Sequence, residues 1–208
     1  MYIPGSFLVE DKKMIHDIIA ANSFATLVSR LEEGITASHL PLLIDEDNQF
    51  LYGHLARVND QCAGLEGQAV LAIFQGPHCY VSPSWYETSR AVPTWNYVSV
   101  HVYGQIELLD EDALLGSLYR MVLKYEGEES AYKPESIDPK YIHDLMKGIA
   151  GFRIRIRKFE AKAKLSQSHS SERQQRIINH LEEIQSGGSR EIAALMKENL
   201  RKDTMETT

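Results

Sequence analysis

The sequence predicts an α+β protein whose body is an antiparallel β-barrel with a few helices around it. Several short β-rich segments follow one another, separated by glycine, proline and acidic turn residues. The segment GFRIRIRKF (residues 151–159) alternates strictly between apolar and cationic side chains, as a half-buried antiparallel strand does. The chain has no alternating βαβ series, no G-x-G-x-x-G motif and no P-loop, which argues against a Rossmann or NTPase fold. Strands at this spacing favour a barrel.

The first part of the chain predicts one helix and then a run of short strands. Asp11 can cap a helix over residues 11–21, whose apolar side chains fall on one face: Met14, Ile15, Ile18 and Ile19. The period then changes, and four segments are β-rich: 24–29, 35–44, 49–55 and 69–75. The acidic run 45–48 predicts the turn of a hairpin between the second and third of these segments.

The middle of the chain predicts a longer strand, two helices and a final strand. Residues 97–109 alternate, with Val98, Val100, Val102 and Ile106 on a buried face. Gly104 in this segment indicates a bulge or a close approach of another backbone. Asp110 can cap a helix over residues 110–125, and Asp138-Pro139 predicts the start of the next helix. The alternating segment 151–159 then closes the barrel.

The segment from residue 76 to residue 97, GPHCYVSPSWYETSRAVPTWNY, has an unusual composition. It contains both tryptophans, Trp85 and Trp95, and three of the seven prolines. We interpret it as a stiff loop that forms the wall of a ligand pocket or a subunit contact, because aromatics carry a large apolar area and prolines fix the backbone. The alternative is that the two tryptophans only fill one end of the β-core.

The C-terminal residues predict a separate helical extension, so we divide the chain into a barrel domain (1–165) and a tail (166–208). A polar linker, SQSHSS, precedes two apolar helical stripes that are separated by Gly187-Gly188, and residues 203–208 are expected to fray. The two helices either pack on the barrel or a partner subunit, or form a helix-turn-helix. The nearly neutral charge of the tail favours packing, since a recognition helix usually has a clearer basic edge.

Composition sets limits on the class of protein. The chain has 208 residues, 43% hydrophobic and 25% charged, with no run long enough to cross a bilayer and no basic-then-apolar signal at its start, so we expect a cytoplasmic protein. The only cysteines, Cys62 and Cys79, form no disulfide framework or CxxC pair. The net charge of −7 argues against a broad nucleic-acid surface.

One local positive face stands out against this acidic background. It comprises six residues near the end of the predicted barrel: Arg153, Arg155, Arg157, Lys158, Lys162 and Lys164. Such a cluster can meet phosphate or an acidic partner surface, or can equally be a solvated strand face. The sequence alone leaves these alternatives open.

The sequence gives little indication of metal binding or of nucleophilic catalysis. Four histidines lie in the predicted barrel: His39, His54, His78 and His101. They form no close ligand pair and no HExxH motif, so we predict no metal site. Ser82 and Ser84 stand outside any G-x-S-x-G elbow, and we predict no catalytic residue.

The segment YGHLARVN, residues 52–59, is the best candidate for ligand binding. A glycine that permits close approach is followed by Arg57 and Asn59 at alternate positions after a predicted strand. Arginine can hold a phosphate with two parallel hydrogen bonds, and asparagine adds a neutral donor. A ligand held there by its phosphate would lay a ring against the adjacent strand, residues 36–41. The alternative is an exposed arginine at a turn.

Six short motifs, in order along residues 1–167, resemble one known family. They are MYIPGSF, ASHLPLL, YGHLARVN, GPHCYVSPSWY, VPTWNYVSVHVYG and KLSQ. On these motifs the chain is identified as a member of the PaiB-type proteins, described as FMN-binding negative transcriptional regulators that repress sporulation and degradative-enzyme (protease) production. Members often carry a histidine where this chain has Ser6.

The resemblance implies a split β-barrel of the pyridoxamine-phosphate-oxidase type. It also implies a homodimer with FMN at two sites between the subunits. By motif, the isoalloxazine edge would meet Thr36, Ser38 and His39, and the ribityl phosphate would meet Gly53, His54, Arg57 and Asn59. The pocket wall, which the partner chain can supply, would comprise Trp95, Asn96 and His101. Lys164 and Gln167 would close the site.

The resemblance leaves the activity open. One hypothesis is a regulator, a dimer that associates with DNA or with another partner and responds to flavin. The other is an FMN-dependent oxidoreductase or flavin reductase with an indirect effect on regulation, because FMN can accept a hydride or single electrons. A third hypothesis is haem binding, since some split barrels bind haem and histidines are plentiful here.

Overall fold

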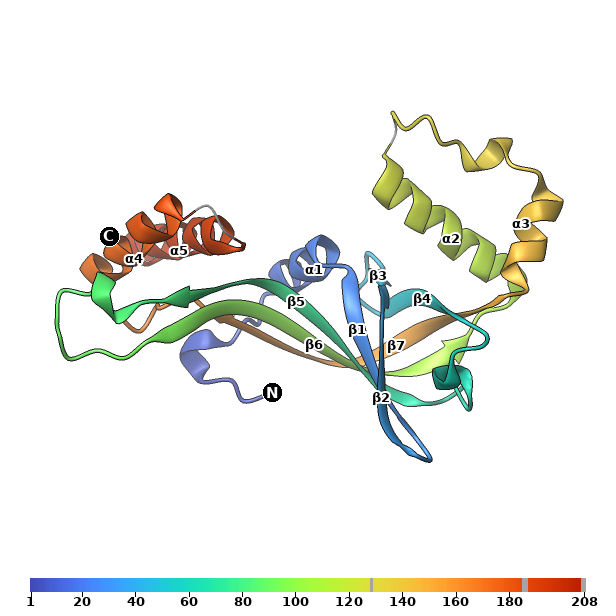
Figure 1. Ribbon diagram of the computed structural model, residues 1–208, viewed down its shortest axis with the longest axis horizontal. Coiled ribbons are helices and arrows are strands. Elements are labelled where there is room, and N and C mark those ends of the chain that lie inside the picture. The colour runs from blue at the N-terminus through green and yellow to red at the C-terminus, as the bar shows by residue number, and fades with distance from the viewer. Residues whose placement is uncertain (128, 185–186, 207–208) are drawn as a thin grey trace. The chain divides into compact units, whose positions relative to one another are not determined.

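The computed structural model describes residues 1–127, 129–184 and 187–206 (Figure 1). Seven strands form one sheet in the order β2-β1-β5-β6-β7-β4-β3. The strands are β1 (Phe24–Leu31), β2 (Gly34–Pro41), β3 (Leu43–Ile44), β4 (Phe50–Ala56), β5 (Ala69–Val81), β6 (Thr94–Leu108) and β7 (Ile149–Lys164). The helices are α1 (Lys12–Ala21), α2 (Glu111–Glu126), α3 (Pro139–Met146), α4 (Ser171–Glu183) and α5 (Ser189–Glu206), with 3-10 turns η1 (Gly5–Phe7), η2 (Asp60–Cys62), η3 (Pro83–Trp85) and η4 (Pro134–Ser136).

The predicted α+β fold on an antiparallel split β-barrel is confirmed. The pairs β1–β2, β1–β5, β3–β4 and β4–β7 are antiparallel. Strands β2 and β3 lie at opposite edges of the sheet, yet Leu42 alone separates them in the chain. One residue can join two edges only if the sheet curls until they meet. Leu42 is fully buried at this seam, and its backbone N–H donates to the Ser23 carbonyl at 2.8 Å.

Two glycines allow the close approaches that the barrel requires. A Cβ at Gly53 would lie 2.6 Å from Leu42 Cδ2 and 3.3 Å from the Pro41 oxygen. A Cβ at Gly104 would lie 2.4 Å from Ile154 Cγ2 and 2.6 Å from the Arg155 oxygen. The close approach predicted at Gly104 is therefore confirmed. At Gly53 the neighbour is the barrel core, and β4 ends at Ala56, one residue beyond the predicted segment 49–55.

The helix starts follow the predicted capping. Asp11 Oδ1 accepts the backbone N–H groups of Lys13 and Met14 at 2.7 and 3.0 Å. Asp110 caps α2 by accepting the Ala113 N–H, and Asp138 caps α3 by accepting the Lys140 N–H. Proline at the first turn of α3 fits, since that position needs no backbone donor. None of the described helices combines the length and apolarity needed to cross a membrane.

The predicted stiff loop over residues 76–97 is too long at both ends. Residues up to Val81 belong to β5, and β6 already begins at Thr94, so only residues 82–93 lie between the strands. The proline at position 77 is tolerated within the strand, and Ser82 caps the short turn η3 by accepting the Ser84 N–H at 3.2 Å. Trp85 stacks on His180 of α4 with ring centroids 5.3 Å apart, whereas Trp95 is about half exposed.

The contacts divide the chain into two compact units, each with its own core. The first contains Met1–Ile18, Gln75–Val100 and the chain from Glu160 through α5; the second contains Ile19–Phe74 and His101–Phe159. In the first unit, α4 and α5 pack on strand segments around one apolar cluster (Figure 1) that comprises Cys79, Val81, Val98, Ala163, Leu165, Ile177, Ile178, Leu181, Ile192, Ala193 and Met196. Of the two alternatives for the tail, the structure has the packed one. The domain boundary at residue 165 stays a prediction.

The C-terminal residues expected to fray lie partly within a helix. Helix α5 continues through residues 203–206, and residues 207–208 lie outside the described residues. Burial of the apolar stripes explains why both tail helices form, since tertiary packing supplies most of the stability of short helices. An ion pair between Arg173 of α4 and Glu87, which lies between β5 and β6, adds a polar contact to this packing.

Replacing Gly104 with alanine should lower the free energy of unfolding by about 1–3 kcal/mol, because the new Cβ would meet a backbone oxygen and a core methyl group that cannot move freely. Gly116 is the matched control: it lies within α2 with open space around it, and Gly116→Ala should raise stability by about 0.5–1 kcal/mol. Chemical denaturation of the three proteins measures both effects. Equal stability of the two variants would contradict the proposed β6–β7 contact.

Candidate functional site

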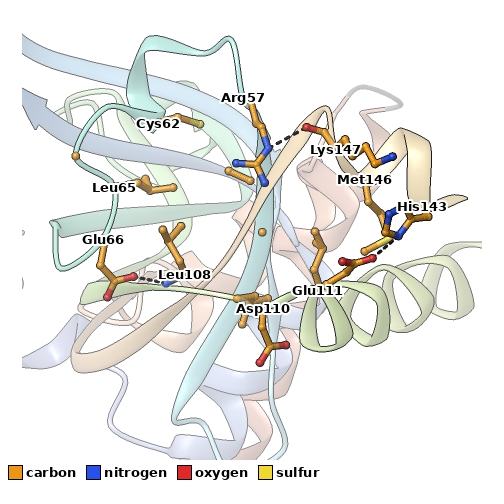
Figure 2. Close-up of a pocket in the computed structure, with 15 residues that line it drawn as sticks. Arg57, Cys62, Leu65, Glu66, Leu108, Asp110, Glu111, His143, Met146 and Lys147 are labelled. Atoms are coloured by element: carbon orange, nitrogen blue, oxygen red, sulfur yellow. Dashed lines mark hydrogen bonds and ion pairs between the residues drawn. The ribbon is translucent and has the colours of Figure 1, made fainter.

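A cavity of about 720 Å³ lies beside Arg57 in the second unit (Figure 2). Its walls come from the turn after β4, the end of β6, the start of α2, helix α3 and the start of β7. The apolar part of the lining includes Leu65, Leu109, Leu114, Met146 and Ala150. This volume is within the usual range for a small-molecule site, and the mixture of an apolar surface with a few polar groups is typical of such sites.

The turn between α3 and β7 holds Arg57 in place. The Arg57 backbone N–H donates to the Gly148 oxygen, and its Nε donates to the Lys147 oxygen, both at 2.9 Å. The guanidinium points into the cavity in Figure 2, and its terminal nitrogens bond to no residue in the described part of the chain. A positioned guanidinium with two terminal nitrogens available is suited to a carboxylate or phosphate.

The other charged groups of the cavity already have partners. Glu111 pairs with His143, and Glu66 accepts the backbone N–H of Leu108 at 2.7 Å. Asp110 is occupied as the cap of α2, and the Lys147 ammonium pairs with Asp144 at 2.7 Å. Arg57 is thus the cation of this lining that remains available for an incoming anion.

Asn59 and Ser38, predicted to share a site, are in contact. Asn59 Nδ2 donates to Ser38 Oγ at 3.0 Å, and Asn59 Oδ1 accepts the Gln61 N–H at 2.9 Å as the cap of η2. The buried Gln61 then ties this turn to β1, because its Nε2 donates to the Leu27 oxygen and to Ser29 Oγ. Through these bonds the turn that carries Arg57 and Asn59 has a fixed position on the β1–β2 hairpin.

Thr36 lines a second, more open cavity of about 840 Å³ that also involves Arg30, Asp60 and Gln68. Thr36 and Ser38 share one face of β2, where both are half-buried, and His39 lies on the opposite, exposed face. His39 Nδ1 lies 3.1 Å from Thr26 Oγ1, and its ring stacks on that of Phe24. The three residues predicted at the isoalloxazine edge therefore do not all face the same way.

Gly53 and His54 likewise alternate on β4. The face of β4 that carries Gly53 is turned toward the core, and His54 is half-buried on the other face of the strand. Burial lowers the pKa of His54, because desolvation disfavours the charged imidazolium. His101, the third histidine of the predicted site, lies in the same unit on β6, with its ring centroid 6.4 Å from that of Tyr103.

The remaining four predicted residues belong to the first unit. Trp95 is exposed and contacts the rings of His78 and Tyr80. Lys164 Nζ donates to Thr94 Oγ1, and the pKa of Lys164 is lowered, mainly by burial and further by the ammonium of Lys162.

The amides of Asn96 and Gln167 are already engaged within this unit. Asn96 is fully buried and exchanges hydrogen bonds of 2.9 and 3.0 Å with Ser166 Oγ. The Gln167 amide accepts the Leu165 N–H and donates to the Ala163 oxygen, both at 2.7 Å. These bonds give both residues a local structural role, and their contact with a ligand stays a prediction.

The basic residues predicted as one positive face are divided between the two units. Arg153 and Arg155 both pair with Glu107, at 2.7 and 2.6 Å. Lys162 is buried, and its ammonium donates to the Tyr2 oxygen and lies 5.1–5.9 Å from the rings of Tyr2, Phe7 and Tyr97. Lys162 and Lys164 belong to the first unit and the arginines to the second. The described residues contain no group of three His, Cys, Asp or Glu side chains placed to hold a metal ion.

Sequence reasoning did not identify the groups that fix Arg57. Lys147 and Gly148 lie about 90 residues further along the chain, in the turn between α3 and β7. The bonds to Arg57 use backbone oxygens, which every residue type offers, so no motif could have revealed them.

Comparison with known proteins places the chain in a family. The family model described as "Putative FMN-binding domain" matches residues 1–158, so the chain belongs to this family of FMN-binding split-barrel proteins, and its cofactor is FMN. The chain is also 36% identical over 206 residues to the protein named "Protease synthase and sporulation protein PAI 2" of Bacillus subtilis (strain 168), covering 97% of this chain and 99% of that protein. The predicted PaiB-type family is confirmed.

Solved structures support the fold alone. The flavocytochrome Anf3 from Azotobacter vinelandii matches with a TM-score of 0.61 and 18% identity, covering 76% of this chain and 69% of that one. The FAD and heme binding protein from Mycobacterium smegmatis matches with a TM-score of 0.59 and 13% identity, covering 75% and 72%. The residues present fit FMN, since the terminal nitrogens of Arg57, which lines the cavity, can donate hydrogen bonds to its phosphate.

The lowered pKa of His54 predicts a pH dependence of stability. His54 binds a proton more readily in the unfolded chain than in the folded chain. The stability that neutral His54 contributes is therefore fully present above the ordinary histidine pKa of about 6.5, and it is lost as pH falls through the lower pKa of the folded state. His54→Gln should therefore reduce the loss of thermal stability between pH 7.5 and pH 5. The pKa of His169 is also lowered, by burial and by Arg173, so a His169→Gln variant measures the contribution of His169 to the same loss of stability. An unchanged pH profile in His54→Gln would contradict the assignment.

Proposed function

We propose that this chain is a homodimeric, FMN-binding negative regulator that acts on sporulation and degradative-enzyme production. The observation that carries the proposal is the near-complete match to the PAI 2 protein, whose name refers to protease synthesis and sporulation. The match covers the tail helices as well as the barrel, so the whole chain is comparable with that protein. The two subunits would form the flavin sites between them.

In this proposal Arg57 binds the FMN phosphate. Asn59 positions the turn and Ser38 fixes Asn59, while Thr36, on the same face of β2 as Ser38, would lie toward the isoalloxazine edge. His39 is on the opposite face of β2 and is left out of this arrangement. His54, on the face of β4 away from the core, would approach the ribityl chain, and the predicted wall of Trp95, Asn96 and His101 would include a contribution of the partner subunit. Lys164 and Gln167 would close the site. FMN supplies hydride or single-electron chemistry when bound, and the chain binds and orients it.

The two cysteines are poorly suited to act as nucleophiles. Burial raises the pKa of the Cys79 thiol to about 11, and burial also raises the pKa of Cys62. Both thiols are therefore mainly protonated at neutral pH, and the thiol is a poor nucleophile compared with the thiolate. We assign no catalytic residue.

Arg57→Ala should weaken FMN binding by about 1.5–3 kcal/mol, roughly 10–100-fold, because it removes charge-assisted hydrogen bonds to the phosphate. Arg176→Ala is the matched control, since Arg176 is exposed on α4 and pairs with Glu172 one turn away. FMN titration followed by fluorescence measures both affinities. Unchanged affinity in Arg57→Ala would remove Arg57 from the site.

The absorbance spectrum of the purified protein, with and without added FMN, tests the proposal most directly. We expect a flavin spectrum that does not bleach on addition of NADH or NADPH, and a dimer in sedimentation analysis. Bleaching at a catalytic rate would favour the oxidoreductase alternative, and a Soret band would favour haem. A monomer that binds no flavin would overturn the proposal.

A further inference from the structure

The wall of the cavity beside Arg57 contains an ion pair that the flavin site described above does not use. Glu111 is the first residue of α2, His143 lies in α3, and their side chains pair with each other (Figure 2). The two side chains are 60% and 49% exposed. An ion pair with this exposure contributes little to stability, so substitutions in it test ligand binding more than folding.

Helix α3 brings this pair close to Arg57. His143 and Lys147 are four residues apart, and side chains at that spacing on a helix lie about 5–6 Å apart. The Lys147 oxygen accepts the Nε–H of Arg57 at 2.9 Å. The imidazole is thus about one helical turn from the group that fixes the guanidinium. An anion bound by Arg57 therefore experiences the charges of His143 and Glu111.

The charges of this wall leave little margin for an anion. Among the described residues of the wall, Arg57 is the cation that remains available, whereas Glu66 and Asp110 add carboxylates. The Lys147 ammonium is offset by Asp144, and Lys147 holds the pKa of Asp144 below its ordinary value. One more carboxylate without a compensating cation would therefore repel a phosphate, because like charges placed close together cost free energy.

We propose that His143 makes the cavity selective for the phosphate of FMN by neutralising Glu111. The inference rests on the flavin site proposed above and names a residue that sets its ligand preference. The protonated imidazole cancels the charge of the Glu111 carboxylate, so a phosphate at Arg57 meets no uncompensated charge at the start of α2. Riboflavin has the ring and the ribityl chain of FMN without the phosphate, and its binding does not depend on this charge. His143 is a positioning residue, since it acts through Glu111.

Titration of FMN and of riboflavin, followed by flavin fluorescence, tests the proposal at low salt and at pH 6, where an imidazole is mainly protonated. His143→Gln leaves Glu111 without a cation and should weaken FMN binding roughly three- to tenfold, while riboflavin affinity changes by less than about twofold. The effect on FMN should shrink at high salt, because salt screens exposed charges. A purely structural role of His143 would produce neither the difference between the two flavins nor the dependence on salt.

A second substitution separates the charge of the pair from its shape. Glu111→Gln/His143→Gln removes both charges and should restore FMN affinity to within about twofold of the wild-type value. His180→Gln is the matched control, because His180 pairs with Glu183 at 3.8 Å on α4 in the first unit. This control should leave the affinities for both flavins unchanged.

Three outcomes would overturn the proposal: unchanged FMN affinity in His143→Gln, equal weakening of FMN and riboflavin, or a double variant as weak as the single one. Equal weakening would make the pair a structural support of the cavity. Arg57→Ala separates this proposal from the flavin assignment. Weaker FMN binding in Arg57→Ala without an effect of His143→Gln would keep the flavin site and remove His143 from it, whereas no FMN binding by the wild-type protein would overturn both.

Discussion

The structure depends on the closure of the sheet at Leu42. Strands β2 and β3 are the two edges of the sheet, and one residue joins them, so the sheet must curl until its edges meet. Burial of Leu42 against Gly53 stabilises this seam through apolar contact, and a Cβ at position 53 would require the Leu42 side chain to move. The closed barrel then brings the turn after β4 against the β1–β2 hairpin.

The position of Arg57 follows from that closure. The Ser38–Asn59 bond and the bonds of Gln61 to β1 tie its turn to one side of the barrel, and the oxygens of Lys147 and Gly148 hold it on the other. The surrounding carboxylates are already occupied, which leaves a guanidinium with capacity for a phosphate. The family match to FMN-binding proteins identifies FMN as the ligand, and this molecule carries a phosphate that such a guanidinium can bind.

Much of the fold could be predicted because local signals agree with the global structure. The caps at Asp11, Asp110 and Asp138, the β3–β4 hairpin and the alternation of β7 are all encoded within a few residues of each element. The loop predicted over residues 76–97 is too long at both ends, because prolines that fix the backbone indicate a loop when only the sequence is considered. Proline at 77 is accommodated in β5, where burial of Cys79 and Val81 against the tail helices outweighs the missing donor.

The sequence by itself determined the class of protein, the periodicity of its elements and the candidates Arg57 and Asn59, because short-range chemistry and family motifs are written along the chain. Tertiary structure alone decided which of these groups remain available to a ligand. It engaged the amides of Asn96 and Gln167 with nearby groups, paired Arg153 and Arg155 with Glu107, and buried Lys162 among aromatic rings. The reason is physical: hydrogen bonds and ion pairs join residues that are distant in sequence, and their partners become known only once the chain has folded.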